Sequence, residues 1–229
     1  MALAGRNVVI TGGTGSLGQI VVQAFLKEGA NVAVPSGGTA GDIPGAAFVG
    51  KCDLSDEKET RIFFDAAAKK TGPADVLVCL AGGYTGGKLV EETSDEDLEG
   101  QFRLNLLTVH NAARMVLGGM KDRRQGRIIT VASMPALQPS AKKAAYAISK
   151  RAVVTLTEVI AQEVWGTGVT CNAIAPSIIR TKANLESMPG AESSRWVSPE
   201  EIAALILFLS SREAGSINGN VIKIYGGVS

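Results

Sequence analysis

Short apolar runs alternate with longer amphipathic segments along the 229-residue chain. The first run, residues 7–11 (NVVIT), is rich in β-branched residues and is followed by glycines, which is typical of a buried parallel strand. Apolar residues then recur at helical spacing from Leu17 to Phe25, and Gly29 suits the end of that helix. The same criteria predict further strands at 32–34, 46–49, 76–80, 127–131, 169–174 and 220–224, and further helices at 56–70, 95–120, 144–165 and 199–210.

The order of these segments predicts one fold class. Strands that alternate with helices form right-handed crossovers and a parallel sheet covered on both faces. We therefore expect an α/β, Rossmann-like, doubly wound sheet, with residues 1–229 in a single domain because no repeat or linker divides them. Residues 35–45 (PSGGTAGDIPG) interrupt the alternation with four glycines and two prolines, and predict a loop without a helix.

The charges nearly cancel, with 23 Lys and Arg against 22 Asp and Glu. Nucleic acids and anionic membranes are bound through a strong positive field, so we expect neither as a partner and expect a small molecule instead. The single histidine, His110, and three cysteines without C-x-x-C spacing argue against a metal site and a disulfide framework. The first residues lack the pattern of a secretory leader, which predicts a cytoplasmic protein.

A glycine-rich motif joins the first predicted strand to the first helix. Residues 11–18 read TGGTGSLG and contain G-x-G-x-x-G. Glycines let the backbone turn tightly and approach a pyrophosphate, which then lies on free amide groups at the helix N-terminus. In this strand, loop and helix context the motif predicts a dinucleotide site. The residues expected to bind the cofactor here are Gly12, Gly13, Thr14, Gly15, Ser16, Leu17 and Gly18.

The end of the second strand bears on which dinucleotide is bound. An acidic residue usually stands there and bonds the adenosine ribose. Here the strand ends Val34-Pro35-Ser36, with neither a carboxylate to repel a 2′-phosphate nor an arginine to attract one. This slightly favours NADP(H) over NAD(H), with Ser36 and the glycine-rich loop as hydrogen-bond donors to the phosphate. A surface loop without a recognition role explains the same residues equally well.

Tyr146 and Lys150 lie in the sequence YAISK, within the predicted helix 144–165. Four residues apart on a helix, their side chains share one face. A free phenol has a pKa near ~10 and exchanges protons poorly at neutral pH unless a nearby cation stabilises the phenolate, as Lys150 is placed to do. Ser133 follows the predicted strand 127–131, so its hydroxyl is expected at the carboxyl edge of the sheet, where ligands of such folds bind. Together these residues predict a proton-transfer site.

With these motifs the chain resembles the short-chain dehydrogenase/reductase family along essentially its whole length. The order and the spacing of the motifs both match, which makes the resemblance specific. The further matching features are Cys52-Asp53-Leu54 after the third strand, Leu80-Ala81-Gly82-Gly83 after the fourth, Asn105 in FRLNLL, and NAIAPSIIRT at 172–181.

The resemblance implies a role for each motif. It implies that Tyr146 protonates the substrate oxygen as a general acid, while Lys150 lowers the pKa of Tyr146 and holds the nicotinamide ribose. Ser133 is implied to orient the carbonyl, and Asn105 to support a water-mediated proton relay. The other residues implied to bind the cofactor are Asp53 and Leu54 beside the adenine, Ala81, Gly82 and Gly83 at the adenosine ribose, and Pro176, Ser177, Ile178, Ile179 and Thr181 around the nicotinamide carboxamide.

Three positions depart from the family pattern, and none of them removes a catalytic group. Ser16 and Ser177 replace glycines, and Leu80 replaces an asparagine, which changes details of the cofactor pocket. Residues 78–87 and 187–196 resemble the corresponding segments of quinonoid dihydropteridine reductases, which reduce a cyclic C=N system with NADH. Those enzymes generally lack the catalytic serine present here, and they carry the acidic ribose-binding residue that is absent here.

The leading hypothesis is an NAD(P)H-dependent oxidoreductase that acts on a small carbonyl or alcohol. A dihydropteridine reductase-like activity is one alternative, and a dinucleotide-sensing module without chemistry is another. The sensing module is disfavoured because the full set of catalytic residues is present. The side chains expected to line the substrate pocket are Tyr84, Met134, Leu137, Met188 and Trp196.

The family resemblance also implies a homodimer or homotetramer, assembled through the predicted helices 95–120 and 144–165. Both helices are apolar on more than one face, so the sequence alone does not separate the core face from a partner face. In the second helix we expect Leu156, Val159 and Ile160 to face the core, and Val153, Thr157 and Ala161 to be available to a partner.

Overall fold

The computed structural model describes residues 3–38 and 42–228. Within them, seven parallel strands form a sheet in the order β3-β2-β1-β4-β5-β6-β7, so the direction of winding reverses between β1 and β4. At such a switch point the loops after neighbouring strands diverge and leave room for a ligand. The strands are β1 (Asn7–Thr11), β2 (Asn31–Ser36), β3 (Phe48–Lys51), β4 (Val76–Cys79), β5 (Gly126–Val131), β6 (Val169–Pro176) and β7 (Val221–Ile224).

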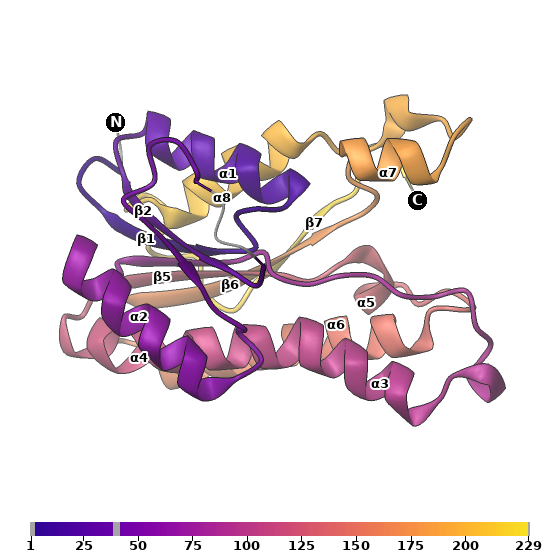
Figure 1. The fold of residues 1–229 in the computed structure, drawn as a ribbon, viewed down its shortest axis with the longest axis horizontal. Coiled ribbons are helices and arrows are strands. Elements are labelled where there is room, and N and C mark those ends of the chain that lie inside the picture. The colour runs from indigo at the N-terminus through magenta and orange to yellow at the C-terminus, as the bar shows by residue number, and fades with distance from the viewer. Residues whose placement is uncertain (1–2, 39–41, 229) are drawn as a thin grey trace.

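Helices cover both faces of the sheet (Figure 1). Helices α1 and α8 pack against each other on one face, and α2, α4 and α6 cover the opposite face. The predicted α/β fold with a doubly wound sheet is therefore confirmed. The helices are α1 (Ser16–Lys27), α2 (Glu57–Thr71), α3 (Asp95–Phe102), α4 (Thr108–Asp122), α5 (Met134–Leu137), α6 (Ala144–Glu163), α7 (Lys182–Ser187) and α8 (Pro199–Ser210).

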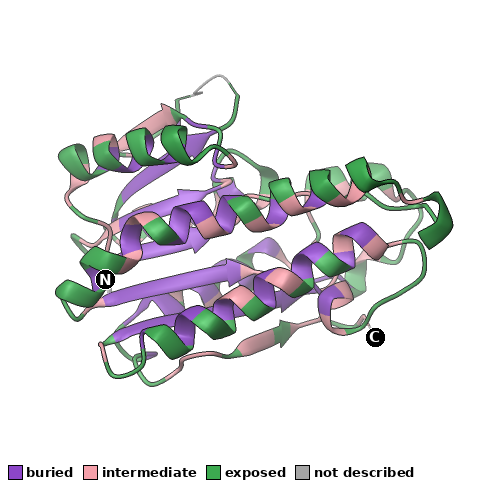
Figure 2. Ribbon diagram, turned by 90° about the horizontal axis from the view of Figure 1, so that it is seen from below, coloured by how far each residue is buried: buried purple, intermediate pink, exposed green. Residues whose placement is uncertain are grey.

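The central strands are buried on both faces (Figure 2). Phe25 and Ile206 belong to the apolar layer on the α1 and α8 side, while Phe63 and Met120 belong to the layer on the opposite side. Because successive strand residues point to opposite faces, a strand covered on both sides needs apolar residues throughout. The short runs of the sequence predicted these strands for that reason, and they give the site a rigid base.

Predicted elements differ from the structure at several places. The third strand, expected over 46–49, spans Phe48–Lys51 and is shifted by two residues. The helix expected over 95–120 is interrupted by a π-helix, Arg103–Leu107, between α3 and α4. The second strand continues through Pro35 to Ser36, two residues beyond its predicted end. The described parts of the segment 35–45 contain no helix, as expected.

The expected faces of α6 were wrong in part: Ile160 is buried in the core as expected, but the residues expected to be available to a partner are buried too. Val153, Thr157 and Ala161 are buried against the sheet and the neighbouring helices, and Thr157 Oγ1 lies 2.7 Å from Thr130 Oγ1 on β5. Val159, which was expected in the core, is 47% exposed. Both faces of this helix are apolar, so only the position of β5 decides which of them is covered. The face available to a partner is the one that carries Val159.

Candidate active site

The glycine-rich loop between β1 and α1 has a backbone path that side chains would obstruct. Gly12 has φ +67°, and a Cβ there would lie 2.7 Å from the backbone that follows β4. A Cβ on Gly18 would overlap Gly12 O, and one on Gly13 would lie 2.8 Å from Val34 Cγ1. Gly15 caps α1 without a side-chain hydrogen bond, which leaves amides at this helix N-terminus available to an anion. The loop therefore fits the pyrophosphate of a dinucleotide.

The segment after β4 lies directly beside this loop. Thr11 Oγ1 accepts a hydrogen bond from Ala81 N at 3.1 Å. A Cβ on Gly82 would lie 2.6 Å from Asn105 Oδ1 and 3.2 Å from Lys150 Nζ. Residues predicted to hold the adenosine ribose thus bridge the glycine-rich loop and the predicted catalytic residues.

Asn105 is the centre of a buried hydrogen-bond network. Its Oδ1 accepts from Gly83 N at 3.0 Å, and its Nδ2 lies 3.1 Å from Gly83 O. The same Nδ2 lies 3.2 Å from both Gln101 Oε1 and Ser149 Oγ, and Ser149 donates onward to Tyr146 O at 2.9 Å. These bonds are made from within the π-helix, a distortion that often marks a functional position. Asn105 therefore fastens the loop after β4 to α6, while its part in a proton relay stays a prediction.

Tyr146 and Ser133 are neighbours, although they come from α6 and from the end of β5. Burial raises the pKa of Tyr146, and the adjacent Ser133 hydroxyl opposes that shift. Ser133 Oγ is buried, and within the described residues it makes no hydrogen bond of good geometry. Buried polar atoms are rarely left without a partner, so an unpaired hydroxyl beside a phenol suits an oxygen atom of a ligand. With its raised pKa, Tyr146 carries a proton at neutral pH and can donate it.

Lys150 is buried one helical turn after Tyr146. Its Nζ donates to Val131 O at 2.8 Å, which fixes the ammonium group near the end of β5. Desolvation lowers the pKa of Lys150 to about 8, and the nearby Cys79 thiol works in the opposite direction. Lys150 is therefore still largely charged at neutral pH. The pKa of Tyr146 is raised by burial, so the lowering of this pKa by Lys150, which the family resemblance implies, stays a prediction.

The residues predicted beside the adenosine are held by their own loops. Asp53 Oδ1 accepts hydrogen bonds from Ser55 Oγ and Ser55 N, both at 2.8 Å, and these bonds lower the pKa of Asp53. Leu54 is buried, and Asn111 Nδ2 donates to its carbonyl at 3.0 Å. Ser36 is buried at the end of β2. These residues share the carboxyl edge of the sheet with the glycine-rich loop.

The segment 176–181, predicted to surround the nicotinamide, is anchored to its neighbours. Ser177 Oγ donates to Tyr225 O at 2.7 Å, so this departure from the family glycine ties β6 to the end of β7. Thr181 Oγ1 caps α7 by accepting from Asn184 N at 3.3 Å. The segment is thereby ordered beyond the carboxyl end of β6.

The structure brings some of the predicted substrate-lining residues to the site. The ring of Tyr84 packs edge-on against the ring of Tyr146, with centroids 4.9 Å apart. Met134 and Leu137 lie on α5, which begins directly after Ser133. Trp196 is 7% exposed, so most of its ring packs inside the protein. Contact of any of these residues with a substrate stays a prediction.

Residues that support the site were missed by the sequence reasoning. Gln101 and Ser149 bond Asn105, and the Cys79 thiol lies near Lys150. Ser149 could have been found from the sequence, because it lies within YAISK, three residues after Tyr146 and directly before Lys150. No sequence pattern marks Gln101 or Cys79, because only packing between distant segments brings them to the site.

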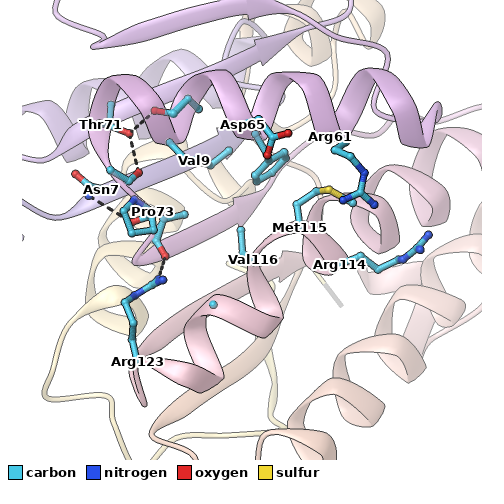
Figure 3. A pocket seen from close by; sticks show the side chains of 16 residues that line it. Asn7, Val9, Arg61, Asp65, Thr71, Pro73, Arg114, Met115, Val116 and Arg123 are labelled. Atoms are coloured by element: carbon cyan, nitrogen blue, oxygen red, sulfur yellow. Dashed lines mark hydrogen bonds between the residues drawn. The ribbon is translucent and has the colours of Figure 1, made fainter.

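A cleft of about 200 Å³ lies between α2 and α4, away from these residues (Figure 3). It is lined by the start of β1 and by the ends of both helices, so it opens near the amino edge of the sheet. Arg114 and Arg61 on its rim both pair with Glu57, and Arg123 donates to Ala74 O at 2.8 Å. None of the predicted site residues lines it, so the cleft is separate from the candidate active site.

Comparison with known proteins agrees with this geometry. The profile of the short chain dehydrogenase family matches residues 6–191. The chain is similar to 3-oxoacyl-(acyl-carrier-protein) reductase FabG of Thermotoga maritima, with 31% identity over 100% of this chain and 99% of the relative. It is also similar to D-beta-hydroxybutyrate dehydrogenase of Cupriavidus necator, with 32% identity over 98% of each protein. A solved structure described as ElxO with NADP bound superposes with a TM-score of 0.89 at 28% identity, covering 97% of this chain and 98% of that one.

The chain belongs to the short chain dehydrogenase family, and it is an oxidoreductase of the NAD(P)-dependent kind. The resemblance of two segments to dihydropteridine reductases receives no support from these relatives and stays a prediction. Among the described residues, no helix has the length and apolar character to cross a membrane. Within the same residues, no three His, Cys, Asp or Glu side chains gather as a metal site would require.

Proposed function

We propose that this protein reduces a small carbonyl compound, with Tyr146 as the proton donor and Ser133 as the group that orients the carbonyl. The observation that carries the proposal is the buried Ser133 hydroxyl, which lacks a good hydrogen bond and lies beside the Tyr146 phenol. A carbonyl oxygen placed between them accepts a hydrogen bond from each. Two converging donors stabilise the negative charge that develops on this oxygen during reduction.

The cradle of Gly12, Gly13 and Gly18 would hold the cofactor pyrophosphate, and residues 176–181 would hold the nicotinamide end. When bound, NAD(P)H supplies the hydride that reduces the carbonyl carbon. Tyr146 transfers its phenolic proton to the carbonyl oxygen, which yields an alcohol and a phenolate. Lys150 stabilises this phenolate because its charged ammonium lies one helical turn away. A proton from water then restores the phenol.

The cofactor preference we propose is for NADP(H). Two observations support it: no carboxylate follows Val34 to repel a 2′-phosphate, and the similar structure of ElxO is described with NADP bound. The relatives named above point to 3-oxoacyl and 3-hydroxyacyl compounds as the first substrates to test. Quinonoid dihydropterin is the matched alternative, because residues 78–87 and 187–196 resemble pterin reductases.

We further propose that the protein is a homo-oligomer that assembles through α4 and α6. Val159 and Ile148 on α6, and Leu107 directly before α4, are exposed apolar residues. Val159 and Leu107 line an open hollow of about 510 Å³. A second copy of the chain would cover this apolar surface, which a monomer would leave in contact with water. Light scattering tests this: Val159→Glu should lower the mass measured for wild type, and a monomeric wild type would contradict it.

The location we propose is the cytoplasm. Cys52, Cys79 and Cys171 are free and buried in the folded chain. A reducing compartment keeps thiols in that state.

The activity is tested by mixing the protein with NADPH or NADH labelled with deuterium at the transferred position. The panel comprises a 3-oxoacyl thioester, a 3-oxo acid, simple ketones and quinonoid dihydropterin. We expect cofactor oxidation and one deuterium atom at the carbinol carbon of at least one alcohol product. If the dihydropterin were turned over fastest, pterin reduction would replace carbonyl reduction as the proposed activity. Tight cofactor binding without turnover on any substrate would contradict an enzymatic role.

A further inference from the structure

One cation at the adenosine end of the site takes no part in the hydrogen bonds described so far. Lys51 ends β3 and is exposed. Within residues 3–38 and 42–228, its ammonium group makes no hydrogen bond or ion pair. The carboxylates that follow it along the chain are engaged elsewhere: Asp53 with Ser55, and Glu59 with Asp53 N. Lys51 is therefore a positive charge without a partner in the described part of the chain.

The register of the sheet places Lys51 next to the end of β2. Ser36 and Lys51 are direct partners in the parallel β2–β3 pair, and Cys52 N donates to Ser36 O at 2.8 Å. Partners in register point to the same face of a sheet, so the side chains of Ser36 and Lys51 leave it on one side. This pairing brings the cation to the strand end that faces the adenosine ribose in dinucleotide-binding folds.

The glycine-rich loop lies on that same side. A Cβ on Gly13 would touch the Val34 side chain, which shows that the loop packs against the face of β2 to which Val34 points. Ser36 is two residues further along β2 and shares that face, and so does its partner Lys51. The cation therefore emerges on the same face of the sheet as the loop that would hold the pyrophosphate, on the strand beyond β2.

We propose that Lys51 binds the 2′-phosphate of NADP(H) and thereby sets a preference for NADP(H) over NAD(H). This inference rests on the proposed function, because it concerns the same cofactor. An exposed lysine binds phosphate as a mobile point charge and needs no preformed pocket. The Ser36 hydroxyl is neutral, so it cannot by itself offset the charge of the phosphate. The described residues between β2 and β3 form no helix, and the neighbouring strand β3 supplies the missing charge.

The test measures binding, so it does not depend on a known substrate. Dissociation constants for NADPH and NADH are measured by calorimetry for wild type, for Lys51→Met and for Lys70→Met. Lys70 is an exposed lysine at the end of α2, near the amino edge, so its replacement makes the same charge change away from the site. The pair of adenosine 2′,5′-bisphosphate and adenosine 5′-monophosphate, which differ only in the 2′-phosphate, is measured in parallel.

We expect wild type to bind NADPH more tightly than NADH. Lys51→Met should weaken NADPH binding by ~10-fold to ~100-fold, the range for loss of a charge-assisted hydrogen bond, and should change NADH binding by less than about 3-fold. Lys51→Glu should go further and favour NADH, because its carboxylate repels the phosphate. Equal weakening of both cofactors, an unchanged ratio, or tighter NADH binding by wild type would overturn the inference while leaving the oxidoreductase assignment intact. Failure of wild type to bind either cofactor would overturn the proposed function, and the inference with it.

Discussion

The proposed catalytic centre and the proposed adenosine edge of this molecule are built in opposite ways. At the centre, Asn105, Tyr146 and Lys150 are held by buried helices and by hydrogen bonds that cross between elements. At the edge, β3 is a short strand at the rim of the sheet, and its last residue, Lys51, is exposed with an unpaired ammonium group among the described residues. The side chains at the centre are held in fixed positions, whereas the charged side chain at the edge is little constrained.

This difference separates chemistry from cofactor choice. A proton donor must be placed within a few tenths of an ångström, which requires packing on all sides. A phosphate ester tolerates a flexible cation. Substitutions at the centre should therefore change turnover and leave cofactor selection alone, while substitutions at the edge should do the reverse.

Among substitutions of the residues around Tyr146, Lys150→Met should have the largest effect on turnover. The variant removes the charge that stabilises the phenolate, so the turnover number should fall by ~10²-fold to ~10³-fold. The turnover number and the cofactor dissociation constant are measured on the same preparation. A fall of less than 10-fold would show that the centre does not depend on this charge.

Gly18→Ala tests the glycine-rich loop, which lies between the two regions. The added Cβ would overlap Gly12 O, so the cradle must shift, and cofactor affinity should fall by ~10-fold or more with a stability loss of ~1–3 kcal/mol. Gly118→Ala is the matched control, because this exposed helical glycine has no atom within 4 Å of the added Cβ. The control should gain up to ~1 kcal/mol and bind cofactor normally. Equal cofactor affinity and equal stability of the two variants would contradict the role of the glycine-rich loop as a cofactor cradle.

Ser133→Ala should reduce turnover by ~10-fold, the value of one neutral hydrogen bond, since one of two donors to the carbonyl is lost. Its melting temperature should stay within about 2 °C of wild type, because the hydroxyl makes no good hydrogen bond that the fold would lose. Steady-state kinetics check the prediction on turnover, and thermal unfolding checks the prediction on melting temperature. A large loss of stability would mean that Ser133 serves the fold and is not reserved for a ligand.

The smallest predicted effect is a pH dependence of stability. Burial lowers the pKa of Lys150 to about 8, so above that pH and up to the ordinary value the unfolded chain binds more protons than the folded one. Burial of the charge therefore costs most below pH 8, and this cost disappears toward pH 10. Lys150→Met should melt ~5 °C higher than wild type at pH 7, with a gap that narrows as the pH rises. A gap independent of pH would contradict the lowered pKa.

The sequence predicted the central part of the fold because strands buried on both faces must be apolar, as residues 76–79 are. It placed Tyr146 and Lys150 together because helical spacing alone brings them to one face, while their catalytic role stays a prediction. It did not predict the break at Asn105, whose partners Gly83 and Ser149 are distant in sequence.

The side of α6 available to a partner was also assigned wrongly, although Ile160 lies in the core as expected. Both faces are apolar, and only contact with β5, where Thr157 meets Thr130, distinguishes them. Lys51 escaped notice for a similar reason, since its relation to Ser36 exists only in the register of two strands. Patterns that repeat along one segment are readable from sequence, whereas pairings between segments are not.

The central claim is that the Tyr146 phenol donates the proton during hydride transfer. Tyr146→Phe keeps the ring and its packing against Tyr84 but removes the proton. Measured with the best carbonyl substrate of the panel, this variant should lose at least ~100-fold in turnover while binding NADPH within about 3-fold of wild type. Turnover near the wild-type rate, with the cofactor bound normally, would contradict the claim.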